Sequence, residues 1–231
     1  MMRGVFIAGT DTDVGKTYVG ALIAKSLVTM GIRIGAYKPV ASGYADWAGS
    51  DGQKLWDSIG RGVSLEDVSP QRFRAPLAPP VAASLENREV NDQHILDAYW
   101  AWKDRCDFLW VEGAGGLCSP VSKHWTNAHL VEQMRLPILL VAAWRLGVVN
   151  QVITTCLAAY AMNLDVKGVV LNEVHAGAED SHVDLLREAM LLPFPGFSSR
   201  RNPPRILCIR HQQEHVDLGK DWEQFFSPPS A

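Results

Sequence analysis

The sequence predicts an α/β fold in which a mostly parallel central sheet is flanked by helices on both faces. Short apolar runs alternate along the chain with longer amphipathic stretches, the pattern of strands joined by crossover helices. Two of these runs, 108–111 and 137–142, are apolar at every position, as in strands covered on both faces. Parallel strands end at the same edge of a sheet, so we expect the ligand site at that edge.

The first elements are a strand at 5–8, a helix from Lys16 to about Met30 and a strand at 33–37. Apolar residues recur at helical spacing in the second of these, and Gly31 is suited to end it because glycine adopts the left-handed backbone easily. A short helix is predicted over 52–59. Four prolines between residues 70 and 80 then predict an irregular middle region.

Asn91 is predicted to cap a helix that runs to about Arg105. The strands at 108–111 and 137–142 follow, then a helix over 148–162 and a strand over 166–171. After about residue 180 the pattern weakens, and the last residues, 227–231, are predicted to be disordered. Because no repeat or long linker divides the chain, residues 1–231 are predicted to form one domain.

Composition narrows the possible partners and the location. The formal net charge is −3 and the pI about 6.2, so the chain has no basic surface for nucleic acid or for an anionic membrane. The four cysteines are widely spaced and form no metal-ligand pattern, which favours reduced thiols. The apolar run near the N-terminus is too short for a signal peptide, and no segment has the roughly 18 apolar residues that span a bilayer. A cytoplasmic protein is therefore expected.

The loop Gly9–Thr17, GTDTDVGKT, lies between the first strand and the first helix. Its glycines permit tight turns that direct backbone N–H groups at phosphates. Lys16 supplies a mobile positive charge, and Thr17 offers a hydroxyl to a magnesium ion that bridges phosphate oxygens. The first glycine lies one residue early, which leaves Thr10 in its usual place. The loop predicts a three-layer P-loop NTPase-like domain that binds a nucleotide.

Two later motifs complete a family pattern. KPVASG begins at Lys38, where the second strand ends, and VEGAGG begins at Val111 and contains Glu112. Together with the phosphate loop, over residues 3–175, these motifs resemble the dethiobiotin synthetase family. The resemblance implies a homodimeric, ATP- and Mg²⁺-dependent ligase. Its substrates are 7,8-diaminopelargonate, carbon dioxide and ATP, and it closes the ureido ring of dethiobiotin through a carbamate and a carbamic-phosphoric anhydride.

The resemblance also assigns roles to residues. Lys38, Lys16 and Thr12 correspond to the catalytic group, and Ser42 joins Thr12 in contacting the diamine and its carbamate. The metal ligands correspond to Thr17, Asp51 and Glu112. The nucleotide contacts correspond to Asp13, Val14, Gly15, Lys16, Thr17, Tyr18, Asp51, Glu112, Gly113, Ala114, Gly115, Asn172 and Glu173. Glu173 stands where the family usually has aspartate.

Alternatives stay open for several of these residues. Lys38 alone could be a solvated surface charge, and Asp51 could simply be the N-terminal cap or the first-turn acid of the helix at 52–59. A carboxylate at the buried position of Glu112 needs a cation or several donors, which favours a ligand role. Gly147, Val148 and Asn150 correspond to the segment that receives the substrate carboxylate across the dimer interface, but they could equally be an ordinary helix start.

The adenine end matches the family less well. In the family a further strand with a Leu-Gly-x-Ile-Pro-like end helps hold the base, and residues 191–201 lack that pattern. The chain could therefore hold the adenine loosely, accept other nucleoside triphosphates, or build the pocket from different residues such as Phe197. The tryptophans are expected in the core or a dimer interface. Competing functions are a related amide-forming synthetase, a regulatory P-loop ATPase that acts through protein partners, and a homologue that binds nucleotide without turnover.

Overall fold

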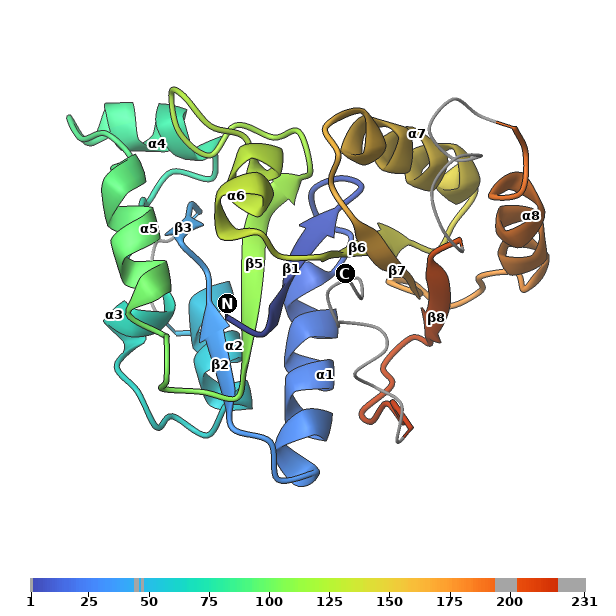
Figure 1. Cartoon of the computed structure of the whole chain (residues 1–231), viewed down its shortest axis with the longest axis horizontal. Coiled ribbons are helices and arrows are strands. Elements are labelled where there is room, and N and C mark those ends of the chain that lie inside the picture. The colour runs from blue at the N-terminus through green and yellow to red at the C-terminus, as the bar shows by residue number, and fades with distance from the viewer. Residues whose placement is uncertain (1, 44–45, 47, 194–202, 220–231) are drawn as a thin grey trace.

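The computed structural model describes residues 2–43, 46, 48–193 and 203–219. A six-stranded sheet with the order β2-β5-β1-β6-β7-β8 runs through its centre, and every neighbouring pair is parallel (Figure 1). The strands are β1 (Gly4–Gly9), β2 (Ile34–Tyr37), β5 (Phe108–Gly116), β6 (Ile138–Ala143), β7 (Val166–Asn172) and β8 (Arg205–Ile209). The predicted parallel sheet is confirmed.

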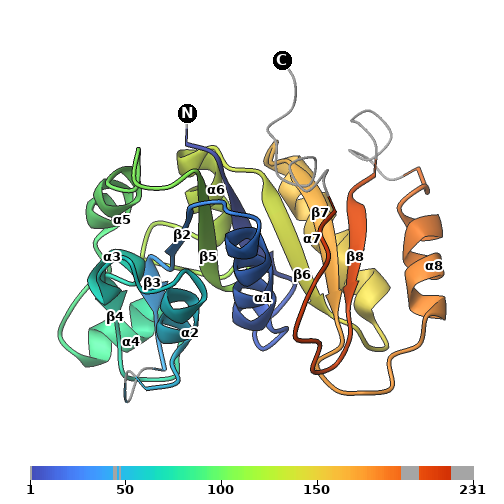
Figure 2. The same ribbon diagram turned by 90° about the horizontal axis from the view of Figure 1, so that it is seen from below.

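Helices cover both faces of this sheet and make three layers. α1 (Lys16–Thr29) and α2 (Asp51–Ser58) lie on one face, and α6 (Asn127–Met134) and α7 (Val148–Ala161) lie on the other (Figures 1 and 2). Right-handed crossovers explain the division, because the chain moves in one direction from β1 to β2 and in the opposite direction from β5 through β6 to β7. α8 (Ser181–Ala189) packs beside α7.

The predicted strands and the two long helices lie within about two residues of their observed bounds, except that β5 continues to Gly116. Gly31 adopts φ 81°, and its N–H donates to the carbonyl of Val28 at 2.9 Å, so it ends α1 as predicted. Asn91 caps α5 (Asp92–Trp100) by accepting from the N–H of His94 at 2.9 Å. The helix stops five residues before the predicted end. Its continuation forms successive turns, and Asp104 at φ 66° cannot belong to a right-handed helix.

The middle region is more regular than predicted. It contains α3 (Leu65–Val68), α4 (Pro79–Leu85) and a two-stranded sheet of β3 (Val40–Ala41) and β4 (Gln71–Arg72). Two of the prolines that predicted irregularity begin α4, since proline is favoured in the first turn of a helix, where its missing N–H is not needed.

The structure has a further edge strand that the sequence did not predict. β8 pairs with β7 from Gly168 opposite Arg205 to Asn172 opposite Ile209. It begins after residues 191–201, where the pattern was sought, and only Ile209 of its five residues is fully buried. Phe197 and the tail at 227–231 lie outside the described residues.

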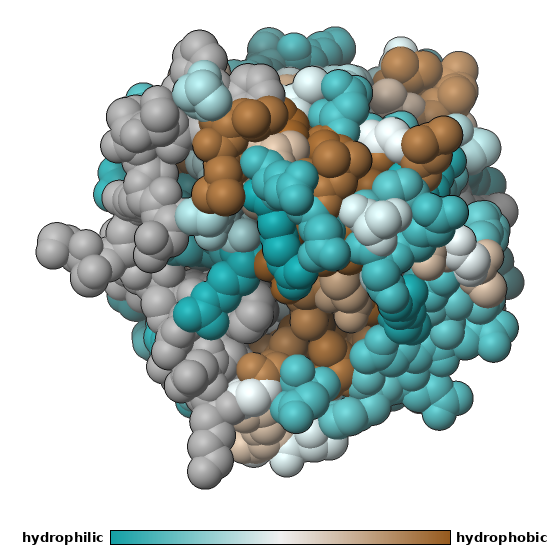
Figure 3. Space-filling model, turned by 90° about the vertical axis from the view of Figure 1, so that its right-hand side faces the viewer, coloured by the Kyte–Doolittle hydropathy of each residue, from teal (hydrophilic) through white to brown (hydrophobic). Residues whose placement is uncertain are grey.

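Trp102 and Trp110 are buried in the core, as expected, whereas the side chain of Trp100 is 49% exposed. Exposed apolar side chains also occur in and after α8, at Leu185 and Leu191, and the face on this side of the molecule mixes apolar with polar groups (Figure 3). Among the described residues, no helix combines the length and apolar character needed to cross a membrane.

Candidate active site

The phosphate loop follows β1 and leads into α1. A Cβ atom at Gly9 would lie 2.5 Å from the carbonyl oxygen of Asp11, and one at Gly15 would lie 2.1 Å from Nδ2 of Asn172. Gly15 also adopts φ 86°, so this tight loop requires glycine at both positions. The Nζ of Lys16 donates to the carbonyl of Asp11 at 3.2 Å, and burial lowers the pKa of Lys16.

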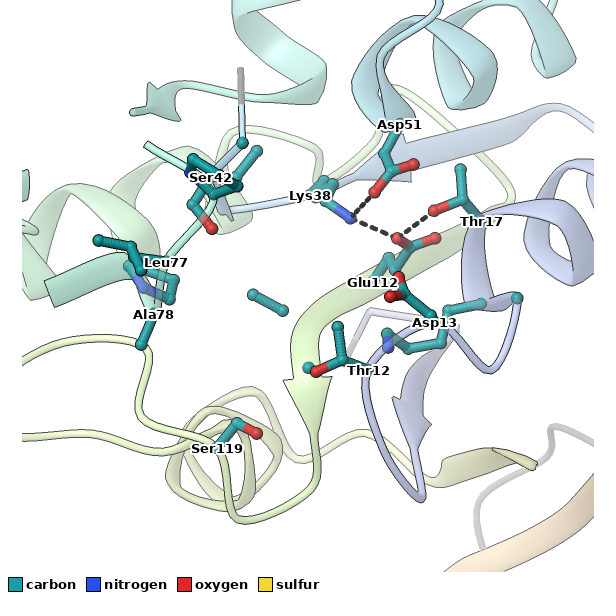
Figure 4. Close-up of a pocket in the computed structure, with 18 of the residues that line it drawn as sticks. Thr12, Asp13, Thr17, Lys38, Ser42, Asp51, Leu77, Ala78, Glu112 and Ser119 are labelled. Carbon is teal, nitrogen blue, oxygen red and sulfur yellow. Dashed lines mark hydrogen bonds and ion pairs between the residues drawn. The ribbon is translucent and has the colours of Figure 1, made fainter. Parts of the chain in front are cut away.

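Lys38 lies between two carboxylates at the end of β2. Its Nζ donates to Oε1 of Glu112 at 2.5 Å and to Oδ2 of Asp51 at 3.0 Å (Figure 4). The hydroxyl of Thr17 donates to the same Oε1 at 2.7 Å. The pairing of β2 and β1 with β5 brings these groups together, because all three strands end at this edge of the sheet. Lys38 is therefore a buried charge and not a solvated surface lysine.

The electrostatics of this cluster follow from its pairing. Burial alone would lower the pKa of Lys38, but the carboxylates of Glu112 and Asp51 outweigh it and hold the pKa above its usual range. Burial would raise the pKa of Asp51, yet the charge of Lys38 keeps it below its usual value. Ser50, not Asp51, caps α2, and Asp51 is at once a first-turn acid and a member of the cluster.

Thr17, Asp51 and Glu112 offer one hydroxyl and two carboxylates, the oxygen donors that Mg²⁺ prefers. Oε2 of Glu112 is buried and has no hydrogen-bond partner among the described residues, so it has capacity for a cation. The described residues hold no group of three His, Cys, Asp or Glu side chains placed around one point. The donor set therefore suits an ion that takes its remaining ligands from phosphate oxygens and water, as Mg²⁺ does at nucleotides.

A cavity of about 810 Å³ opens beside this cluster. It is within the size range of small-molecule sites. The cavity brings together twelve of the residues that the sequence proposes: Thr12, Asp13, Gly15, Lys16, Thr17, Tyr18, Lys38, Ser42, Asp51, Glu112, Ala114 and Gly115.

The wall of the cavity that faces the phosphate loop was not predicted. It contains the segment Pro76–Pro79, which leads into α4, and Lys54 on α2 and Ser119 and Pro120 after β5 also line the cavity. Ser42, Leu77 and Ala78 face Thr12 and Asp13 across the open space, with Ser119 nearer the phosphate loop (Figure 4). The prolines of the middle region were the available signal, but they indicated only a loop and not where it would fold.

The role of Asn127 was also not predicted from the sequence. It is fully buried at the start of α6, and its Nδ2 donates to the carbonyls of Ala114 and Gly116, each at 2.7 Å. Ser119 holds the same segment from the other side, because its Oγ accepts from the N–H of Gly116 at 2.9 Å. These bonds fix the glycine-rich end of β5, which forms part of the cavity wall.

The remaining proposed residues do not line this cavity: Val14, Gly113, Gly147, Val148, Asn150, Asn172 and Glu173. Asn172 lies at the end of β7 and donates from Nδ2 to the carbonyl of Val14 at 3.0 Å, so it contacts the back of the phosphate loop. The side chain of Val148 is buried in the core of its own chain, and Asn150 is exposed.

The chain is similar to several known proteins. A family model described as an AAA domain matches residues 3–196. The ATP-dependent dethiobiotin synthetase BioD of Rhodopirellula baltica is 39% identical over an alignment of 193 residues that covers 76% of this chain and 75% of that protein. The protein of the same name from Bacillus subtilis is 30% identical over an alignment of 222 residues that covers 94% of this chain and 96% of that protein. Among solved structures, the septum site-determining protein MinD of Pyrococcus horikoshii, complexed with Mg-ADP, is 17% identical with a TM-score of 0.47, over 84% of this chain and 79% of that one.

Proposed function

The chain belongs to the ATP-dependent dethiobiotin synthetase family, and on that premise we propose how its residues divide the work of the reaction. As a member it is an ATP-using ligase of biotin biosynthesis, which forms the ureido ring of dethiobiotin. One observation carries the proposal: a single cavity joins the phosphate loop to a second wall, with the buried Lys38 between them.

The two substrates occupy different sides of this cavity. The triphosphate lies on Asp13, Gly15, Lys16 and Thr17, where backbone N–H groups and the start of α1 favour anions. The nucleoside extends toward Asn172, the last residue of β7, and Glu173, which follows it. The diamine lies between Thr12 and Ser42, and its apolar chain contacts the Pro76–Pro79 wall.

The reaction requires two anions, the carbamate and the triphosphate of ATP, to be held next to each other. One amine of the diamine adds to carbon dioxide and loses a proton, which gives a carbamate. A carbamate oxygen then attacks the γ-phosphorus, and the bond to ADP breaks. The second amine attacks the carbonyl of the resulting anhydride, the ring closes, and phosphate and a proton leave. Lys16 and Lys38 are the catalytic residues, because their charges stabilise the negative charge on the transferred group.

Thr17, Asp51 and Glu112 are the residues that would hold Mg²⁺. The bound ion supplies neutralisation of charge on the phosphate oxygens. Oε2 of Glu112, buried and unpartnered among the described residues, supports this role. Lys38 must then share its two carboxylate partners with the ion.

We also propose a homodimer of single-domain chains that works in the cytoplasm. The segment Gly147–Asn150 does not line the cavity of its own chain, and Leu146 beside it is 90% exposed, so a second copy could use this segment to complete its site. Only the backbone of Val148 is available for a substrate carboxylate. The four cysteines are free, as expected in the cytoplasm, where thiols stay reduced. Light scattering of the purified protein tests the dimer.

A stoichiometric assay tests the activity. Purified protein is incubated with ATP, Mg²⁺, diaminopelargonate and bicarbonate, and phosphate release is measured beside dethiobiotin identified by mass. We expect one phosphate per dethiobiotin and almost no phosphate when the diamine or bicarbonate is left out. Phosphate release that does not depend on the diamine or on bicarbonate would instead indicate a regulatory ATPase. If neither phosphate nor dethiobiotin forms, the protein would be a homologue that only binds nucleotide.

A further inference from the structure

The turn Arg210–Gln213, directly after β8, is shaped by its own hydrogen bonds. The N–H of Gln213 donates to the carbonyl of Arg210 at 3.1 Å, and the N–H of Arg210 donates to Oε1 of Gln213 at 2.9 Å. Gln212 adopts φ 57°, a left-handed conformation that costs free energy for a non-glycine residue and needs support from its surroundings. The turn is thus a built feature and not an extended tail.

Two sets of contacts, with residues that follow β6 and β7, hold this turn. Oε2 of Glu173 accepts from the N–H of His211 at 3.0 Å, while its Oε1 accepts from the N–H groups of Gly177 and Ala178 at 2.9 and 2.8 Å. The guanidinium of Arg210 lies 4.3 Å from the ring centroid of Trp144 and pairs with Asp180. With both oxygens engaged, the Glu173 carboxylate braces the turn.

The third support comes from the phosphate-loop helix. The hydroxyl of Tyr18 donates to the carbonyl of Gln213, which lies 195 positions later in the chain. Two turns along α1, Oγ of Ser26 donates to the carbonyl of Val216 at 2.9 Å. Eight helical residues rise about 12 Å, and three extended residues span about 10 Å. The segment Gln213–Val216 therefore runs along one face of α1, and Tyr18 fixes its first residue.

Together these contacts form a closed series around one side of the phosphate loop, here called the ring: Tyr18, the turn Arg210–Gln213, Glu173 and Asn172. Tyr18 lies directly after Thr17 and lines the cavity, with 39% of its surface exposed. Asn172, next to Glu173, contacts Val14 in the loop. The strand order places β7 and β8 on one side of β1, and β5 and β2, with the proposed diamine site, on the other. The ring therefore stands where the nucleoside must leave the loop.

We propose that Tyr18 is a positioning residue for the nucleoside of ATP: its hydroxyl holds the turn Arg210–Gln213 against α1, so that the base and ribose meet a fixed wall. This inference rests on the proposed function, since it needs ATP on the phosphate loop. Because the hydroxyl acts on the turn and not on the phosphates, its loss weakens only ligands that carry a nucleoside.

The test compares two ligands on two variants. Calorimetry measures the Kd of ATP and of inorganic tripolyphosphate, which lacks the nucleoside, in Mg²⁺ buffer without diamine. For Tyr18→Phe we expect the Kd of ATP to rise about 3- to 10-fold, the value of one hydrogen bond, and the Kd of tripolyphosphate to change less than about twofold. Tyr99→Phe is the matched control, because it removes a hydroxyl that donates to the carbonyl of Met134 in the core, and we expect it to change neither Kd.

Glu173→Gln provides a second way to release the turn, because its single amide oxygen cannot replace both carboxylate oxygens: with that oxygen on the N–H groups of Gly177 and Ala178, the N–H of His211 faces an amide nitrogen, which cannot accept. It should reproduce the ATP-selective loss even if Tyr18→Phe folds poorly. Equal weakening of both ligands, or an unchanged Kd of ATP in both variants, overturns the proposal. Both measurements are of binding, so they can be scored whether or not the protein makes dethiobiotin. Failure of the assay for dethiobiotin would count against the proposed function alone.

Discussion

The Nζ of Lys38 lies 2.5 Å from Oε1 of Glu112, and the side chains of this ion pair are 6% and 0% exposed. The same lysine reaches Asp51, so its charge occupies the space between two carboxylates that we propose as Mg²⁺ ligands. An unpaired carboxylate at this depth would be costly. In the free protein Lys38 therefore compensates charges that the metal ion compensates when it is bound.

Replacing Lys38 by alanine tests this relationship. We expect dethiobiotin formation to fall by roughly 10²- to 10³-fold or more, since a charge that stabilises the transferred phosphoryl group is lost. Without Mg²⁺ the variant should unfold at a lower temperature than the wild type, because Glu112 loses its partner. Added Mg²⁺ should raise the unfolding temperature of the variant by more than it raises that of the wild type. Lys103→Ala, at an exposed lysine, is the control. Near-wild-type product formation by Lys38→Ala would remove Lys38 from the mechanism.

The two carboxylates should differ in their effect on Mg²⁺ binding. Glu112 is fully buried and its Oε2 has no hydrogen-bond partner within the described part of the chain, whereas the side chain of Asp51 is 48% exposed. We expect Glu112→Gln to raise the Mg²⁺ concentration for half-maximal ADP binding by more than tenfold, and Asp51→Asn to raise it less, because water can replace an exposed ligand more easily. Calorimetric Mg²⁺ titrations with ADP measure both. A larger effect at Asp51 would contradict the proposed order.

Asp67 gives the fold a pH-dependent contribution. Its oxygens accept from both terminal nitrogens of Arg105 at 3.1 Å, and this pairing, aided by Ser64, lowers the pKa of Asp67 to about 2. A carboxyl group with a lowered pKa stabilises the fold above its unfolded pKa of about 3.9 and stops doing so as the pH falls toward 2. Asp67→Asn should therefore cost about 1 kcal/mol at pH 7, after solvent screening, and almost nothing near pH 2.

Urea unfolding from pH 7 to pH 2 measures this difference. Asp57→Asn serves for comparison, because Asp57 belongs to an exposed pair with Arg61, four residues away, of the kind worth about 0.3–0.5 kcal/mol. An equal difference between wild type and Asp67→Asn at both ends of the pH range would mean that the carboxylate charge plays no part.

Sequence patterns predicted the buried parts of the fold and the local motifs. β5 and β6 were evident because strands covered on both faces are continuously apolar, and the phosphate loop was evident because its function depends on adjacent backbone groups. β8 was missed because an edge strand needs one buried face only, and just Ile209 is fully buried. The Pro76–Pro79 wall was missed because its place in the cavity depends on contacts far apart in sequence.

The role of Asn127 also depends on contacts that local sequence patterns do not reveal, and the last prediction concerns this residue. Its amide joins α6 to the carbonyls of Ala114 and Gly116, a role that no local pattern reveals. Asn127→Ala takes this donor from the part-buried carbonyl of Ala114, a loss of about 1–3 kcal/mol, and removes a second bond at Gly116, worth about 1 kcal/mol because that carbonyl still accepts from the N–H of Ser119 at 3.0 Å. We expect a total loss of about 2–4 kcal/mol in urea unfolding. Gln93→Ala removes an exposed amide from α5 and should cost less than about 0.5 kcal/mol.

The same substitution should act on one substrate more than the other. Ala114 and Gly115 line the cavity, and the side-chain hydrogen bonds of Asn127 go to Ala114 and Gly116 in β5, whereas Tyr18 and Asn172 contact the turn after β8 and the phosphate loop. We therefore expect Asn127→Ala to raise the KM for the diamine several-fold, because the glycine-rich end of β5 loses its brace, with a smaller change in the KM for ATP. Steady-state kinetics with each substrate varied in turn measure the two values. An equal rise in both would indicate that the destabilised fold, and not the cavity wall, limits the variant.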